Sequence, residues 1–182
     1  MRTNSWTWVV NLSTCLLLSA CSPEHNWREI GFEGAALKAQ LPCKPDRTTR
    51  SVPLGGVPVD LQVAGCESAT AMLAVMTAPL QAGADAQAIL VGWQQATLRN
   101  AGVKLPLSAD QQQIWRRPGF LPLASGVQIK AEGQRADGQA VHVRAAWGAV
   151  GEGDHVRLVH AVVYDQRDPA TLAATLLDGI HP

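Results

Sequence analysis

The sequence predicts an α+β domain, in which a central helix and a C-terminal helix pack on an antiparallel sheet. Three observations predict this class. Short apolar or alternating runs, typical of strands, occupy residues 27–76 and 127–164. A helical pattern separates these two groups, and a second one closes the chain. Groups of strands interrupted by single helices favour an antiparallel sheet, because a parallel sheet alternates strand and helix.

Residues 27–41 open the expected domain with a mixed pattern that has three expected core residues: Ile30, Phe32 and Leu37. Pro42 and Pro45 then indicate a strand end and a turn, because proline lacks the N–H group that a sheet interior needs. A polar, arginine-bearing run over residues 46–51 follows.

Alternation over residues 57–63 predicts a half-buried strand with three valines and a leucine on one face. Gly55-Gly56 before it predicts a turn, so that residues 52–54 pair with this strand as a hairpin. The apolar run over residues 70–76 has the length of a strand and suits a central one.

The clearest helix is expected over residues 85–101, because Asp85 can cap its first turn and Gly102 can end it. Its apolar positions recur near helical spacing: Ala86, Ile89, Leu90, Trp93 and Leu98. Residues 103–124 contain three prolines and are expected to cross the domain irregularly. The side chains expected to order that segment are Ile114, Trp115, Phe120 and Leu121.

The last third is expected to be a meander with strands at residues 127–132, 141–147 and 156–164. Asp137-Gly138 predicts one hairpin turn, and the glycine-rich residues 148–153 predict the next. A closing helix is expected over residues 168–180, with Asp168 as its cap and Pro169 at its first position. The buried stripe of this helix is expected to be Leu172, Leu176 and Ile180.

Four features carry a resemblance to bacterial envelope proteins with a PsbP-like α/β/α sandwich. They are the Leu41-Pro42-Cys43-Lys44-Pro45 turn, Cys66, the helix at residues 85–101, and the segment 133–138 before the meander. The resemblance covers residues 27–180. It implies a three-layer architecture and brings no catalytic residues with it.

Leu18-Ser19-Ala20-Cys21 resembles the lipobox of bacterial lipoproteins and follows a short apolar stretch. The resemblance implies that residues 1–20 are a removed signal peptide and that Cys21 becomes a lipid-modified N-terminus. Residues 21–28 are then expected to be a short tether, and residues 29–182 a single domain. The residue after the lipid cysteine is Ser22 and not the aspartate that signals retention in the inner membrane, so the resemblance implies location at the periplasmic face of the outer membrane. The alternatives are an ordinary cleaved signal and a membrane anchor, although a spanning helix needs about 20 mostly apolar residues.

Two further cysteines, Cys43 and Cys66, are expected to form a disulfide, because an exported pair in an oxidising compartment is normally bonded. Cys15 lies inside the signal and leaves with it. Two thiols alone make a poor zinc site, since zinc usually takes four ligands. The mature sequence also has no CxxC motif that would indicate thiol–disulfide exchange.

Basic and acidic side chains number 15 each, so the balance of charge gives no reason to expect nucleic acid as a partner. The expected partners are the membrane that receives the lipid anchor and an envelope protein. No glycine-rich phosphate loop is present, and no cofactor is expected.

Three histidines in the meander, His142, His155 and His160, are the main candidates for chemistry. His142 and His160 lie on strands that can pair and approach one another, and His155 lies beside Glu152 and Asp154 in a turn. No HxH, HxxxH or HExxH spacing accompanies them, so no metal is expected.

Serine chemistry is not indicated either, because neither GxSxG nor SxxK occurs. Ser68 and Ser125 are expected to be turn residues. Four tryptophans remain after processing, and they either fill the core or line an apolar pocket: Trp27, Trp93, Trp115 and Trp147. The core is favoured, because Trp93 and Trp147 occupy inward positions of their elements.

These observations predict a lipid-anchored envelope protein that acts as a non-enzymatic interaction or accessory module, with no catalytic residues. Two alternatives remain open. One is a periplasmic module that binds a small apolar ligand, and the other is a hydrolase or metal-dependent enzyme that uses the C-terminal histidines.

Overall fold

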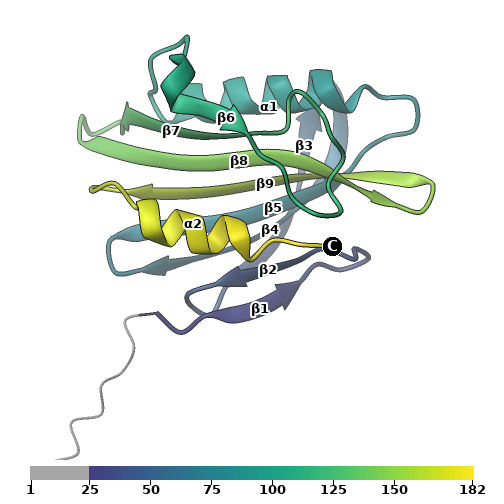
Figure 1. Ribbon diagram of the computed structural model, residues 1–182, viewed down its shortest axis with the longest axis horizontal. Coiled ribbons are helices and arrows are strands. Elements are labelled where there is room, and N and C mark those ends of the chain that lie inside the picture. Colours follow the sequence, from purple (N-terminus) through teal and green to yellow (C-terminus); the bar gives the residue numbers. More distant parts are fainter. Residues whose placement is uncertain (1–24) are drawn as a thin grey trace, which may run out of the picture.

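A seven-stranded antiparallel sheet forms the middle layer of the computed structural model, which describes residues 25–182 (Figure 1). The strand order is β3-β4-β5-β9-β8-β7-β6, and β1 and β2 form a separate two-stranded sheet. The strands are β1 (Arg28–Gly31), β2 (Lys38–Leu41), β3 (Asp46–Leu54), β4 (Val57–Ser68), β5 (Ala71–Pro79), β6 (Gln112–Ile114), β7 (Val127–Gln134), β8 (Ala140–Glu152) and β9 (His155–Asp165). The helices are α1 (Ala86–Asn100), a short 3-10 helix η1 (Ala109–Gln111) and α2 (Ala170–Asp178).

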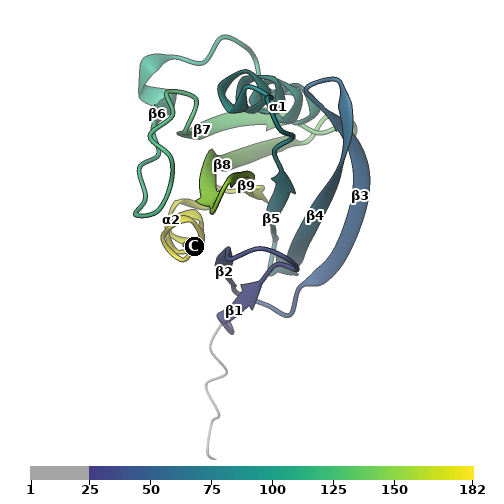
Figure 2. The ribbon, with the colours of Figure 1, turned by 90° about the vertical axis from the view of Figure 1, so that its right-hand side faces the viewer.

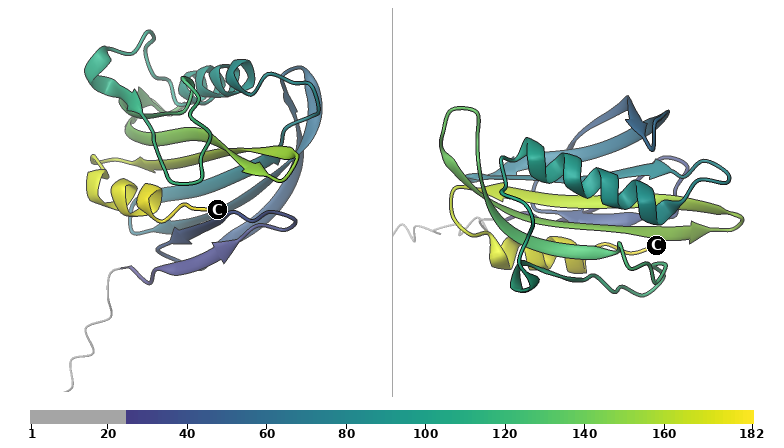
Figure 3. Two further views of the ribbon diagram at one scale, coloured as in Figure 1. Left: turned by 45° about the vertical axis from the view of Figure 1, so that its right-hand side comes forward. Right: turned by 90° about the horizontal axis from the view of Figure 1, so that it is seen from above.

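The two helices lie on opposite faces of this sheet (Figure 2, Figure 3), so the predicted α+β class is confirmed. On one face, α1 packs over a core that includes Leu90, Trp93 and Trp147. On the other face, α2 and the small β1–β2 sheet share a second core, which includes Leu41 and Leu176. Each face of the sheet therefore has its own buried cluster, as period-two alternation of strand side chains requires.

The central helix agrees with its prediction nearly to the residue. Asp85 caps α1, and its carboxylate accepts hydrogen bonds from the backbone N–H groups of Gln87 at 2.8 Å and Ala88 at 3.4 Å. Gly102 follows the end of the helix with φ +66°, a left-handed conformation that glycine adopts at little cost.

The predicted hairpin is also present but is longer than its apolar pattern indicates. Residues 52–54 pair with β4 as expected, and the pairing continues back to Asp46, which lies opposite Gly65. Residues 46–51 are exposed on this edge strand, so no alternation marks them. Backbone hydrogen bonds, which every residue except proline can form, carry this part of the sheet.

Two local predictions in the last third are wrong. Residues 148–153 are not a turn, because β8 continues to Glu152 and the chain reverses at Gly153-Asp154. Gly148 is needed for packing instead: a Cβ there would lie 2.8 Å from the ring of Phe120. Asp168 does not cap α2, which begins at Ala170 with no side-chain cap, because its carboxylate binds Arg144.

The crossing segment, residues 103–124, is mainly irregular as predicted, but it contributes η1 and the edge strand β6. Figure 2 shows it passing from the α1 side of the sheet to the α2 side around the β6 edge. Trp115 is buried as expected, whereas Ile114 is 46% exposed. Within residues 25–182, no helix has the length and apolar character needed to span a membrane.

Candidate functional site

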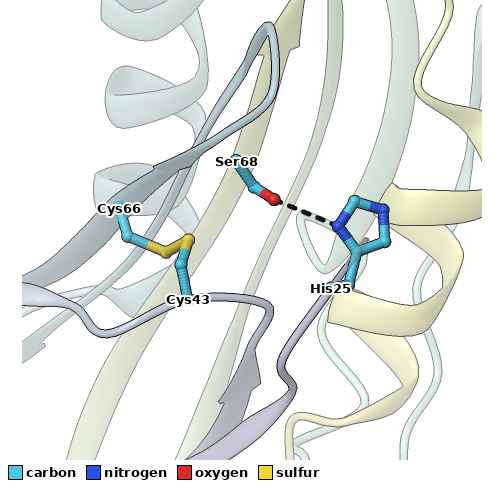
Figure 4. Close-up of a disulfide and its surroundings, with 4 residues drawn as sticks. All are labelled: His25, Cys43, Cys66 and Ser68. Atoms are coloured by element: carbon cyan, nitrogen blue, oxygen red, sulfur yellow. Dashed lines mark hydrogen bonds between the residues drawn. A yellow bond between two sulfur atoms is a disulfide. The ribbon is translucent and has the colours of Figure 1, made fainter. Parts of the chain in front are cut away.

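A disulfide between Cys43 and Cys66 joins the segment after β2 to strand β4, with Cα atoms 6.1 Å apart (Figure 4). This confirms the predicted pairing. The bond fastens the small sheet to the large one close to the first described residues. Cys15 and Cys21, with the predicted signal and lipid site, lie outside the described residues.

Ser68 lies at the last position of β4, directly before a turn, and it contacts the start of the described chain. Its hydroxyl is 3.0 Å from Nδ1 of His25, as Figure 4 shows. Across the described part of the chain, His25 forms no ion pair with a carboxylate. A Ser–His–acid arrangement therefore does not form here, and the contact joins the first described residue to the end of β4. Ser125 lies in a turn, as predicted.

The three candidate histidines do not form one site. His142 pairs in register with Asp165 on the α2 face of the sheet, whereas His160 pairs with Trp147 on the α1 face. The expected approach of His142 and His160 is therefore wrong. The strand partner of His160 is Trp147, which lies five residues from His142 along β8, and an odd number of steps along a strand leads to the opposite face. His155 lies at the exposed end of β9. Among the described residues, no three His, Cys, Asp or Glu side chains gather as metal ligands do.

His160 is instead enclosed in the core beneath α1. Its Nδ1–H donates to the carbonyl of Ala146 at 3.0 Å, and the hydroxyl of Thr97 lies 3.5 Å from Nε2. Burial lowers the pKa of His160 to about 4, and the bond to Ala146 opposes that shift. The ring is therefore neutral at physiological pH and acts as a packing group.

Three of the four tryptophans lie in the core, as favoured, rather than around a large pocket. Trp93, Trp115 and Trp147 are all buried, and Trp27 is half-buried near the chain start. Trp93 also borders an apolar groove of about 470 Å³ between α1 and the tip of the β3–β4 hairpin. Leu54 and Ile89 form its other walls.

A second groove, of about 670 Å³, lies beside α2 and has a mainly polar lining. Its floor is the α2 face of β6, β7 and β8, where cross-strand pairing places Gln113, Gln128, Lys130 and Arg144 together. One wall is α2, and the other is η1 with the chain that follows β6. We call this cavity the α2 groove.

Four cations line the α2 groove: Arg116, Arg117, Lys130 and Arg144. Arg144 binds Asp168 through Nε at 2.8 Å and Nη2 at 2.6 Å, and this contact raises the pKa of Arg144 and lowers that of Asp168. Arg117 donates to the carboxylate of Asp178 at 2.8 Å and to its backbone carbonyl at the end of α2.

The remaining two cations are held less firmly. Lys130 lies 3.9 Å from Asp110, and both side chains are more than half exposed. Arg116 is exposed and forms no ion pair within residues 25–182. The groove thus combines two fixed guanidinium groups with a lysine in a long, exposed ion pair and one arginine that has no ion pair among the described residues.

Sequence reasoning did not find the α2 groove, because its lining comes from four separate segments. The only local signals were Gln111-Gln112-Gln113 and Arg116-Arg117, which on their own read as part of an irregular loop. Comparison with known proteins adds no assignment, because neither a family model nor a curated protein matches this chain.

Proposed function

We propose that this protein is a lipid-anchored envelope protein whose domain is a non-enzymatic interaction module. The observation that carries the proposal is the Cys43–Cys66 disulfide, which agrees with an exported chain. The Leu18-Ser19-Ala20-Cys21 motif supports the anchor. The separation of His142 from His160 supports the interaction module over the enzymatic alternative, because these two histidines share no site.

The geometry at the chain start suits a short anchor. Cys21 precedes His25 by four residues, and an extended chain of that length spans at most about 14 Å. Contacts of His25 with Ser68 and of Asn26 with Pro42 fix the point where the tether leaves the domain. A lipid on Cys21 would therefore hold the β1–β2 end of the domain close to the membrane, while the disulfide ties that end to the main sheet.

Palmitate labelling in a bacterial host tests the anchor, and the two N-terminal cysteines provide a matched pair. The Cys21→Ala protein should lose the label and stay unprocessed or soluble. The Cys15→Ala protein should be labelled and processed like the wild type, because Cys15 leaves with the signal. Equal labelling of wild type and Cys21→Ala would overturn the anchor.

Crosslinking in intact envelopes tests the interaction module. The wild-type chain should yield a reproducible adduct with an envelope protein, and the same adduct should appear in independent preparations. Complete absence of adducts at several crosslinker lengths would contradict a role in protein interaction.

The apolar groove beside Trp93 favours a second candidate, a module that binds a small apolar ligand. Its size falls within the range of ligand sites, although it is open to solvent along α1. An apolar fluorescent probe tests this candidate: Ala88→Trp should block the groove and abolish binding, because Ala88 is exposed on its rim. Unchanged probe binding by this variant would exclude the groove as a ligand site.

A further inference from the structure

We propose that the α2 groove binds an extended acidic segment of a partner protein. This inference rests on the proposed interaction module and names the surface and the kind of partner. Its volume, about 670 Å³, suits a few residues of extended chain. Charged, amide and apolar side chains line different parts of the groove, and each kind favours a different part of the occupant.

The charges favour an acidic occupant. The groove lining holds four cations and two carboxylates, Asp110 and Asp178. Asp168 pairs with Arg144 from beside the groove, so one positive charge is left over. The ion pair with Asp178 fixes Arg117, so this side chain is already ordered before a ligand arrives. The Nε–H of Arg117 is buried and donates to no acceptor in the described chain, although buried donors normally have one. Arg116 lies next to it without a carboxylate partner.

The floor favours a peptide backbone. Gln113 and Gln128 lie side by side on β6 and β7, and their amide groups form no hydrogen bonds with described residues. A side-chain amide has both donors and an acceptor, so it matches the alternating C=O and N–H groups of an extended chain. A carboxylate alone would use only the donors.

The α2 wall favours small apolar side chains on one side of that chain. It presents Ala170, Ala173, Ala174 and Leu177, which offer no hydrogen-bonding side chain. Successive side chains of an extended peptide point to opposite sides. A segment that alternates acidic and apolar residues therefore directs its carboxylates toward Arg116 and Lys130 and its apolar side chains toward α2.

Fluorescence anisotropy with the purified full-length chain in detergent tests the proposal directly. The probe is a fluorescein-labelled peptide in which glutamate and valine alternate, and the matched peptide has glutamine in place of glutamate. The glutamate peptide should bind more tightly, and added salt should weaken it, because exposed charges are screened. Equal binding of the two peptides would overturn the proposal.

Variants locate the binding site. Arg116→Gln combined with Lys130→Gln should weaken binding of the glutamate peptide about tenfold. Arg50→Gln is the matched control, since Arg50 is an exposed arginine on β3, at the opposite edge of the sheet. Ala174→Phe should fill the groove from the exposed side of α2 and also weaken binding at least about tenfold. Thermal melting should show that each variant is folded.

Two outcomes would contradict the proposal. If Arg50→Gln lost binding, or if the groove variants bound the peptide as tightly as the wild type, the peptide would bind elsewhere. Tighter binding of an acidic oligosaccharide, such as oligogalacturonate, would replace the peptide with a different ligand. Either outcome leaves the palmitate and crosslinking tests of the proposed function unaffected, so the two failures are distinguishable.

Discussion

The imidazole of His160 stacks on the indole of Trp147, with ring centroids 4.5 Å apart and planes inclined by only 7°. Trp93 of α1 also contacts His160, edge-on, with ring centroids 5.2 Å apart. These three rings connect α1 to β8 and β9 at the centre of the sheet. Since His160 is 1% exposed, protonation would place a charge in an apolar core.

The free energy of unfolding should therefore fall when the pH is lowered through the range in which His160 titrates. The pKa of His160 is about 4 in the folded chain and about 6.5 when unfolded, so the unfolded state binds the proton first. The contribution of neutral His160 to the free energy of unfolding should be fully present above about pH 6.5. It should decrease by about 3 kcal/mol as the pH falls to 4. Urea unfolding at a series of pH values measures this slope.

Two variants isolate the contribution of His160. His160→Gln should remove most of the slope between pH 6.5 and 4, whatever its effect on stability at neutral pH. Leu172→Ala removes no titratable group and should leave the slope unchanged. A slope that persists in His160→Gln would assign the effect to other groups.

The elements that sequence reasoning found are those whose side chains repeat with a clear period. The helix at Ala86–Asn100 has a cap and an apolar face, and the alternation in β8 separates its two faces. The missed part of β3 has no such period, because an edge strand whose side chains are exposed on both faces selects no residue type. Its pairing depends on β4, which lies farther along the chain.

Glycine and aspartate give wrong local predictions where tertiary contacts override local preference. The local sequence predicts a turn at Gly148, yet this glycine lies in β8 and allows Phe120 to approach the strand. Asp168 reads as a helix cap, yet Arg144 on β8 binds it. The α2 groove could not be predicted for the same reason, since it exists only after four segments meet.

The disulfide should be fully formed in protein purified from its host without reductant. Thiol labelling of denatured, unreduced protein should find no free Cys43 or Cys66. The double variant Cys43→Ala/Cys66→Ala should lose about 3 kcal/mol of unfolding free energy, as expected for a loop of this length. Adding reductant should destabilise the wild type and leave the double variant unchanged. Free thiols in the unreduced wild type would contradict the prediction.

Leu176 should be one of the most sensitive positions in α2. Its side chain is fully buried between the helix and the sheet, so Leu176→Ala should cost about 2–5 kcal/mol in urea unfolding. Leu172, one turn earlier, is only half-buried and provides the matched control. Equal and small losses for both variants would mean that α2 contributes little to the core.

Glycines with different surroundings should respond in opposite directions to an added methyl group. A Cβ at Gly133 would lie 1.9 Å from the carbonyl oxygen of Ala101, at the end of α1. The same oxygen accepts the N–H of Gln134, so it cannot move without losing that bond. Gly133→Ala should therefore destabilise the fold by about 1–3 kcal/mol or more.

Gly92 provides the opposite case within the helix that Gly133 touches. It lies in the interior of α1, and a Cβ there would have no atom within 4 Å. Because alanine has the higher helix propensity, Gly92→Ala should stabilise the chain by about 1 kcal/mol. Urea unfolding of both variants, measured side by side, checks the pair. A stabilised Gly133→Ala would show that α1 does not approach β7 as closely as the contact with Ala101 requires.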